Sequence, residues 1–109
     1  MAGPIFLGEF EQLVLSAVLH LDNDAAVLEV KAKLDEIAGR PVSRGALYRT
    51  LDRLAEKGWV SWSIDDDERP ERGGHPRRRL GVTKHGVSVL RASRRALLHL
   101  WRGIEREIG

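Results

Sequence analysis

Residues 42–80 constrain the fold of this 109-residue chain more than any other segment. In residues 43–54 apolar side chains recur at three- and four-residue steps behind a serine, which is the spacing and N-cap of an amphipathic helix. Residues 59–64 have the aromatic and β-branched content of a strand, and residues 78–82 can form its partner. The long loop between them is rich in arginine and glycine. The segment therefore predicts a helix followed by a β-hairpin with a basic tip.

The predicted helix has two chemically different faces. Leu47, Leu51 and Leu54 cluster on one side together with Thr50, so this side is expected to face a core. The opposite side is basic, and arginine can either read guanine edges with two parallel hydrogen bonds or bind phosphate. An ordinary solvated surface is the alternative interpretation of such a face. The residues of this helix predicted to bind DNA are Ser43, Arg44, Gly45, Tyr48, Arg49 and Arg53.

The arginine-rich part of the hairpin is the second candidate. Arginines around a glycine pair make a positive tip that fits the narrow minor groove of DNA or straddles its phosphates. The alternative is that some of these arginines pair with the acidic residues 65–67 across the hairpin. The residues here that are predicted to bind DNA are Arg72, Gly73, Gly74, His75, Arg77 and Arg78.

Three further helices are predicted outside this segment. Residues 7–21 and 25–38 each repeat the helical apolar spacing, and Thr83 is a suitable N-cap for a final helix of about 24 residues. The apolar stripe of that last helix is longer than a small domain can cover, so pairing with a second copy of the chain is expected. The stripe residues predicted to form this dimer are Leu90, Leu97, Trp101, Ile104 and Ile108.

These elements together predict a mainly α-helical fold with a small β-hairpin. A helix presented beside a basic hairpin is the arrangement of a winged helix-turn-helix, which binds duplex DNA. We therefore expect a winged-helix DNA-binding domain over residues 1–83 and a C-terminal dimerisation helix over residues 84–109.

Composition narrows the function classes. The chain has no cysteine, which excludes disulfides and thiolate metal sites, and its four histidines show no metal-binding spacing. No catalytic motif is found, so we expect neither an enzyme nor a cofactor. Residues 5–21 are apolar but contain two glutamates and a helical period, which argues against a membrane span and for a cytoplasmic protein. The net charge of +2 hides the local concentration of arginine.

The chain resembles the PadR family of bacterial transcriptional regulators. The resemblance rests on residues 43–54 (SRGALYRTLDRL), 57–60 (KGWV), 72–80 (RGGHPRRRL) and 82–86 (VTKHG). In order and spacing these segments match the recognition helix of the family, its wing and its strand-to-helix junction. The resemblance covers most of the chain.

The resemblance implies roles for particular residues. Tyr48 would make the tyrosine contact of the family with DNA, with Arg49 beside it, and the glycine pair 73–74 with neighbouring arginines would form the wing. The final helix would pack on the first helix of a partner subunit, which adds Phe10 to the predicted dimerisation residues.

We therefore expect a homodimeric, sequence-specific DNA-binding regulator whose partner is double-stranded DNA of pseudo-palindromic sequence. It would be a repressor released by a small-molecule or stress signal. Two other interpretations stay open. The winged helix can be a protein-protein interaction module, since a basic tip also suits an acidic protein. A small-molecule sensor with an aromatic pocket built by Trp62 and Trp101 at the dimer centre is compatible with DNA binding.

Overall fold

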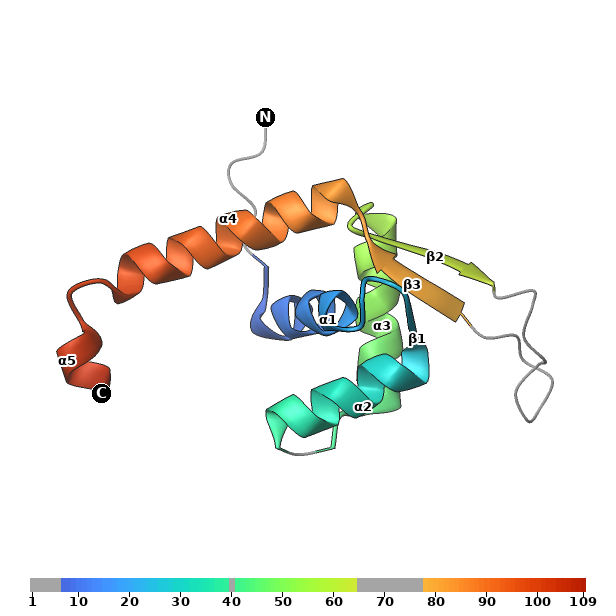
Figure 1. Ribbon diagram of the computed structural model, residues 1–109, viewed down its shortest axis with the longest axis horizontal. Helices are drawn as coiled ribbons and strands as arrows, with labels where there is room; N and C mark the ends of the chain where they lie inside the picture. The colour runs from blue at the N-terminus through green and yellow to red at the C-terminus, as the bar shows by residue number, and fades with distance from the viewer. Residues whose placement is uncertain (1–6, 40, 65–77) are drawn as a thin grey trace.

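One small sheet lies at one side of a group of helices in the computed structural model, which describes residues 7–39, 41–64 and 78–109 (Figure 1). One short strand of the sheet precedes the helix-turn-helix in the chain, the other two strands follow it, and the longest helix comes after the sheet. The elements in chain order are α1 (Glu9–His20), β1 (Ala25–Ala26), α2 (Val27–Ala38), α3 (Arg44–Glu56), β2 (Val60–Ile64), β3 (Arg78–Val82), α4 (Lys84–Trp101) and α5 (Glu105–Ile108).

The sheet is antiparallel, with the strand order β1-β3-β2. The predicted hairpin is confirmed, because β2 pairs with β3 in a register that sets Trp62 opposite Leu80. The third strand was not expected. The prediction that Ala25 and Ala26 begin the second helix is wrong, since both are buried strand residues that pair with β3.

Asn23 explains why the chain forms a strand at this point. It adopts a left-handed conformation with φ of 57°, which asparagine tolerates better than most residues. Its side-chain oxygen accepts a hydrogen bond from the Val82 backbone N–H at 2.6 Å, and its amide donates to the Val82 carbonyl at 3.2 Å. The turn is thereby attached to the end of β3, and the small alanines that follow lie alongside that strand.

The core lies where the helix faces meet the sheet. In α3 the residues Leu47, Thr50, Leu51 and Leu54 are all buried, which confirms the two-faced helix predicted from the sequence. Side chains from the other elements complete this cluster, namely Val14, Leu15 and Val18 of α1, Val30 and Leu34 of α2, Leu80 and Val82 of β3, and Trp59 before β2.

The start of α4 is fixed against the end of α3. The hydroxyl of its N-cap, Thr83, accepts a hydrogen bond from the Gly86 backbone N–H at 3.0 Å and donates to the Gly58 carbonyl at 2.6 Å. Gly86 itself lies so close to Trp59 that any Cβ would overlap the Trp59 carbonyl oxygen. A glycine is therefore required in the first turn of α4, which accounts for its place in the VTKHG segment.

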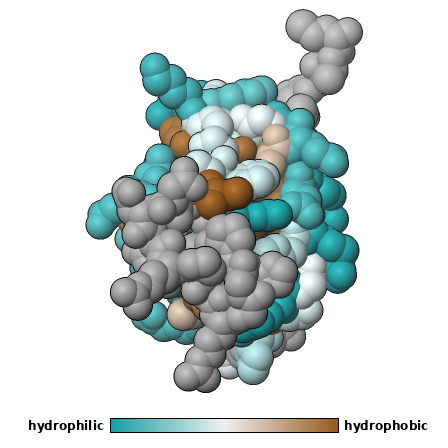
Figure 2. Space-filling view, turned by 90° about the vertical axis from the view of Figure 1, so that its right-hand side faces the viewer, coloured by the Kyte–Doolittle hydropathy of each residue, from teal (hydrophilic) through white to brown (hydrophobic). Residues whose placement is uncertain are grey.

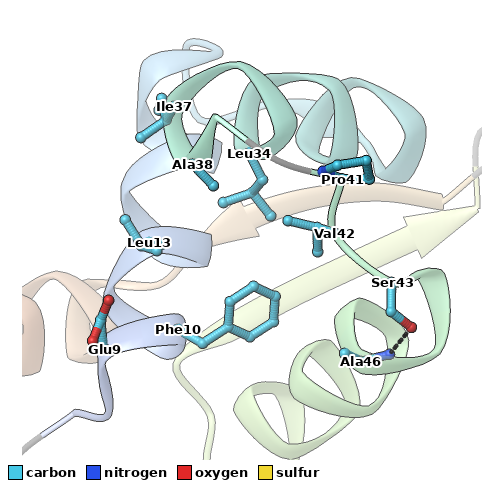
Figure 3. A pocket seen from close by; sticks show the side chains of 10 residues that line it. All are labelled: Glu9, Phe10, Leu13, Leu34, Ile37, Ala38, Pro41, Val42, Ser43 and Ala46. Atoms are coloured by element: carbon cyan, nitrogen blue, oxygen red, sulfur yellow. Dashed lines mark hydrogen bonds between the residues drawn. The ribbon is translucent and has the colours of Figure 1, made fainter.

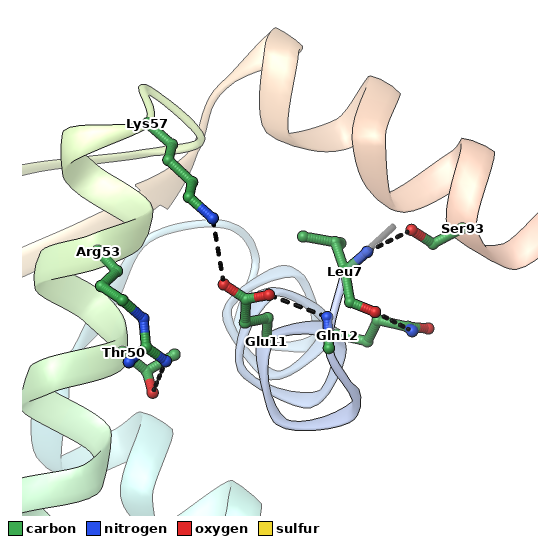
Figure 4. A network of polar contacts seen from close by, with 8 residues as sticks. Leu7, Glu11, Gln12, Thr50, Arg53, Lys57 and Ser93 are labelled. Atoms are coloured by element: carbon green, nitrogen blue, oxygen red, sulfur yellow. Dashed lines mark hydrogen bonds and ion pairs between the residues drawn. The ribbon is translucent and has the colours of Figure 1, made fainter. Parts of the chain in front are cut away.

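The middle of α4 is attached to the segment that leads into α1. Ser93 is buried in α4, and its hydroxyl accepts a hydrogen bond from the Leu7 backbone N–H at 3.2 Å (Figure 4). Gln12 of α1 donates to the Leu7 carbonyl at 3.1 Å. On the other side of α1, Glu11 lies 3.9 Å from the Lys57 ammonium at the end of α3. These contacts set the direction in which α4 leaves the core.

The prediction of one continuous C-terminal helix is wrong. α4 ends at Trp101, Arg102 is extended, and Gly103 has a φ of 88°, which favours glycine and cannot continue a right-handed helix. The Gly103 N–H donates to the Glu105 carboxylate at 2.8 Å, and the short helix α5 follows. No helix among the described residues is both long and apolar enough to cross a membrane.

Candidate nucleic-acid interface

The turn between α2 and α3 places the N-terminus of α3. One carboxylate oxygen of Asp35 accepts a hydrogen bond from the Val42 backbone N–H at 2.7 Å, and the other lies 2.7 Å from the Lys31 ammonium. The hydrogen bond from Lys31, followed by the one from Val42, lowers the pKa of the Asp35 carboxyl below its ordinary value of 3.8. Ser43 then caps α3 through its hydroxyl, which accepts from the Ala46 N–H at 3.3 Å.

The first two turns of α3 present a basic, exposed face. Arg44, Gly45, Tyr48 and Arg49 are all exposed, as the sequence predicted for this side of the helix. The Arg49 guanidinium lies over Gly45, because a Cβ placed on that glycine would be only 3.1 Å from Arg49 Nη1. Glycine therefore allows this guanidinium to lie close to the helix N-terminus.

This helix end is electrostatically different from those of α1 and α2. The first turns of α1 and α2 contain glutamates, whereas the first turn of α3 contains no acidic residue. Within the described part of the chain, neither Arg44 nor Arg49 forms an ion pair. The exposed N–H groups of a helix start and nearby cations both attract anions, so this end of α3 is suited to phosphate.

Arg53 lies further along the same helix. Its guanidinium donates to the Thr50 hydroxyl at 3.4 Å, a contact within α3. Arg53 is exposed and shares the outer face, but it is about two turns from the N-terminus. It is therefore placed beside a ligand of the N-terminal end and not at its centre.

Arg78 joins the base of the hairpin to α3. Its guanidinium carbon lies 4.4 Å from the centre of the Trp62 ring on β2 and 5.9 Å from that of Tyr48 on α3. Its Nη1 is 3.5 Å from an Asp52 carboxylate oxygen. We call Tyr48, Asp52, Trp62 and Arg78 the hairpin-base cluster. It places a guanidinium directly beside the predicted DNA-contacting tyrosine.

Two members of this cluster, Asp52 and Trp62, were not among the residues predicted to bind DNA. Trp62 is about half exposed, whereas Trp59 is buried. Seen from the hairpin end of the molecule, the described surface is mostly hydrophilic with small apolar patches (Figure 2). The aromatic content of the hairpin could have indicated Trp62 as a site residue. The contact between Trp62 and an arginine on β3, however, depends on the strand register.

Arg79 points to the other face of the sheet and has acidic neighbours there. Its Nε donates to the Asp24 carboxylate at 3.0 Å, and its Nη1 is 3.8 Å from a Glu29 oxygen. The hydrogen bond from Arg79 lowers the pKa of the Asp24 carboxyl. An arginine of the basic run therefore does pair with acids, as the alternative interpretation allowed, but these acids come from the turn before β1 and from α2.

The remaining predicted DNA contacts of the loop lie outside the described residues. They are Arg72, Gly73, Gly74, His75 and Arg77, and the acidic residues 65–67 lie in the same segment. The described part of the interface is thus the outer face of α3 together with the hairpin-base cluster.

A groove opens beside the N-cap of α3. It has a volume of about 960 Å³ and lies between α1, α2 and the turn that leads into α3 (Figure 3). The Phe10 ring points into it toward Val42, and Leu13 and Ile37 line its walls. Glu9 provides a carboxylate at its edge and Ser43 a hydroxyl. The groove is therefore mostly apolar and adjoins the residues that set where α3 begins.

The predicted dimerisation residues fall into two groups. Phe10 and Leu90 are partly buried against the core. The others are exposed on the part of the chain that extends beyond the core, and they are Leu97, Trp101, Ile104 and Ile108. Trp62 and Trp101 of one chain do not share a pocket, because β2 and the end of α4 lie on opposite sides of the molecule (Figure 1).

Known structures share this architecture. A PadR family transcriptional regulator from Eggerthella lenta DSM 2243 is 25% identical, with a TM-score of 0.70 over 91% of this chain and 80% of that one. RosR of H. salinarum is 23% identical, with a TM-score of 0.70 over 89% of this chain and 79% of that one. A mutant MarR from E. coli complexed with operator DNA is 24% identical, with a TM-score of 0.63 over 82% and 54% of the two chains. A search of curated proteins finds no match.

The family assignment rests on a longer match than any single motif. The model of the transcriptional regulator PadR-like family matches residues 15–92, which run from α1 through the helix-turn-helix and the sheet into α4. This range includes every described residue of the interface above. The match extends over more than half of the chain, and the protein therefore belongs to the transcriptional regulator PadR-like family.

Proposed function

We propose that this protein binds operator DNA sequence-specifically as a homodimer and acts as a transcriptional repressor, released by a small-molecule or stress signal. One observation carries the DNA-binding part. The exposed N-terminal face of α3 gathers Arg44, Arg49 and Tyr48 at a helix end with no acid in its first turn, and neither arginine has an acidic partner in the described chain.

The geometry suggests how the two kinds of contact divide. The N-cap hydroxyl of Ser43 and the free N–H groups beside it suit a backbone phosphate. Arg49, held over Gly45, and Arg44 are long enough to reach base edges in a major groove, where an arginine binds guanine with two hydrogen bonds. Phosphate contacts would supply most of the affinity, and base contacts would supply the specificity.

A gel-shift experiment tests the recognition face. Binding sites would first be selected from a random pool of duplexes, and Arg49→Ala or Tyr48→Ala would then be compared with the wild type. Losing a two-hydrogen-bond base contact costs about 1–3 kcal/mol, so Arg49→Ala should weaken binding by roughly 5- to 150-fold. Lys33→Ala, on α2 and paired with Glu36, is the matched control. Unchanged affinity in both α3 variants would remove this face from the interface.

The homodimer in the proposal is supported by apolar side chains that the chain alone leaves uncovered. Leu97, Leu100 and Trp101 near the end of α4 are 42–67% exposed, and Ile104 and Ile108 continue the exposure through α5. A cluster of this kind on a small protein is characteristic of an interface. With two-fold symmetry, two copies of α3 would face half-sites about 34 Å apart on the duplex.

Substitutions in this apolar cluster test the homodimer. Trp101→Asp or Ile104→Asp places a charge where the partner would pack, so sedimentation should show monomers where the wild type is dimeric. Arg106→Asp, a charge change in the exposed helix α5, is the control. A wild type that sediments as a monomer at micromolar concentration would contradict the dimer.

The release signal is supported only by the groove beside Ser43. A molecule seated between α1 and the α2–α3 turn would contact Val42 and Phe10, and it would thereby act on the residues that place the start of α3. Its mostly apolar walls and the single carboxylate of Glu9 suit an apolar ligand with a cationic group.

A further inference from the structure

The outward face of α4 carries Arg91, Arg94, Arg95 and Arg102, which we call the arginine strip. All four residues are exposed; Arg91, Arg94 and Arg95 lie within about 100° of one another around α4, and Arg102 is the extended residue directly after the helix ends. They line a shallow hollow of about 580 Å³ together with Leu98 and His99. α4 contains no acidic residue at all, so nothing on the helix offsets these charges.

No acid from elsewhere in the described chain reaches the strip either. None of the four arginines forms an ion pair or a side-chain hydrogen bond with a described residue. Arg78 and Arg79 on β3 behave differently, since each lies within 4 Å of a carboxylate. Like charges at helical spacing repel one another, and a bound anion would relieve that repulsion.

The strip is separated from the recognition face of α3. Thr83, the N-cap of α4, is hydrogen-bonded to Gly58, which lies just after the C-terminal end of α3. The start of α3 is a whole helix away, about 20 Å at 1.5 Å per residue. Figure 1 shows the same arrangement, with α4 crossing one end of α3 and the turn from α2 at the other. A duplex that lies on the N-terminal face of α3 therefore leaves the strip free.

Arg91 and Arg95 also lie on a different side of α4 from the apolar residues that a partner copy would cover, whereas Arg94 lies beside Trp101. Val89 and Ser93 face the core, and Arg91 and Arg95, two residues further on in each case, point away from it. Leu97 and Trp101 lie between these two directions. A homodimer formed through Leu97 and Trp101 would thus still present Arg91 and Arg95 to solvent.

We propose that the arginine strip is a second binding surface for the phosphate backbone of a DNA duplex, so that one dimer can hold two duplex segments. Two observations favour nucleic acid over an acidic protein. The cations are all arginines, which bind phosphate with two parallel hydrogen bonds. The strip has only Leu98 as an apolar anchor, whereas protein interfaces depend on buried aromatic and aliphatic anchors, and DNA interfaces are the more basic and polar class.

A bridging assay tests the proposal, which relies on the proposed function for the first duplex only. A duplex of mixed sequence is immobilised on beads, the intact protein is added, and capture of a second, fluorescent duplex is measured over a series of salt concentrations. Arg91→Gln/Arg95→Gln should reduce that capture about tenfold or more near 0.1 M salt. Its log–log salt dependence should become shallower by about 2, since two phosphate contacts are removed. Arg91→Lys/Arg95→Lys keeps the charge and should retain most of the capture.

Controls separate the two surfaces. Lys33→Gln/Arg106→Gln removes the same charge outside both and should bridge like the wild type. Arg44→Ala/Arg49→Ala should weaken binding to the immobilised duplex. If that variant binds the immobilised duplex as tightly as the wild type, the proposed function of α3 is wrong, independently of the result for the arginine strip. If Arg91→Gln/Arg95→Gln bridges duplexes as well as the wild type, the strip does not bind DNA. A fluorescent polyglutamate peptide is tested in the same way as the second duplex. If the protein captures the peptide and not the duplex, the proposal is overturned in favour of an acidic protein.

Discussion

Ser93 provides the sharpest test of how the C-terminal helix is held. Its hydroxyl is buried in α4 and accepts a hydrogen bond from the Leu7 backbone N–H at 3.2 Å. Leu7 is itself 5% exposed, so in Ser93→Ala this N–H would lose its acceptor in a place that water hardly reaches. Leaving a buried donor unsatisfied costs about 1–3 kcal/mol.

Ser88→Ala is the matched control on the same helix. Ser88 is exposed, and both variants gain the same helix propensity of about 0.5 kcal/mol, because alanine is the better helix former. The free energy of unfolding of the two variants should therefore differ by about 1–3 kcal/mol, with Ser93→Ala the less stable. For a domain of this size that corresponds to a melting temperature lower by roughly 4 °C or more.

Thermal melts at one fixed protein concentration measure this difference, since a dimer melts at a concentration-dependent temperature. Urea titrations should give the same order with unchanged slopes. Equal melting temperatures for Ser93→Ala and Ser88→Ala would refute the reasoning. The Leu7–Ser93 contact would then contribute nothing to the attachment of α4, and another contact would have to direct this helix.

Two further predictions concern the turn before α3 and the hairpin-base cluster. The pKa of Asp35 is lowered in the folded protein, so its contribution to stability is complete above about pH 3.8 and is lost as the pH falls through the lower folded value. Asp35→Asn should therefore flatten the fall in melting temperature between about pH 5 and pH 2, and parallel curves for variant and wild type would contradict this. Arg78→Ala removes an exposed cation–π contact and an exposed ion pair, so it should lower the free energy of unfolding by about 1 kcal/mol. If Arg78 also contacts phosphate, the variant should reduce the salt slope of DNA binding by about 1, whereas Trp62→Ala should leave that slope unchanged.

Local signals predicted the parts of the fold that depend on neighbouring residues. The apolar spacing of α3 and the cap at Ser43 are short-range features, and both are confirmed. The β2–β3 hairpin followed from strand composition and is also confirmed. The break after α4 was missed although Gly103 signals it, because Ile104 and Ile108 continue the apolar spacing of the helix beyond this glycine.

Other features could not be read from spacing, because they depend on contacts between distant segments. Ala25 and Ala26 are good helix formers, and only their pairing with β3 makes them a strand. The partner of Arg79 was sought in the acidic loop nearby, but it is Asp24, 55 positions away in the chain. Asp52 lies on the outer side of α3, and it is the strand register that brings Arg78 to it.

In this protein the arginines that stabilise the fold have a carboxylate nearby, whereas the arginines proposed to bind DNA have none. The positions of the acidic residues therefore say more about function than the number of arginines. Arg78 and Arg79 lie next to each other on β3, point to opposite faces of the sheet, and each finds a carboxylate within 4 Å. Arg44 and Arg49 lie at a helix end without acids, and the arginine strip lies on a helix without any. The net charge of +2 for the whole chain therefore does not reveal the two basic surfaces, one at the start of α3 and one on α4. Because exposed charges more than about 10 Å apart are largely screened at physiological salt, the two surfaces should attract polyanions independently of each other.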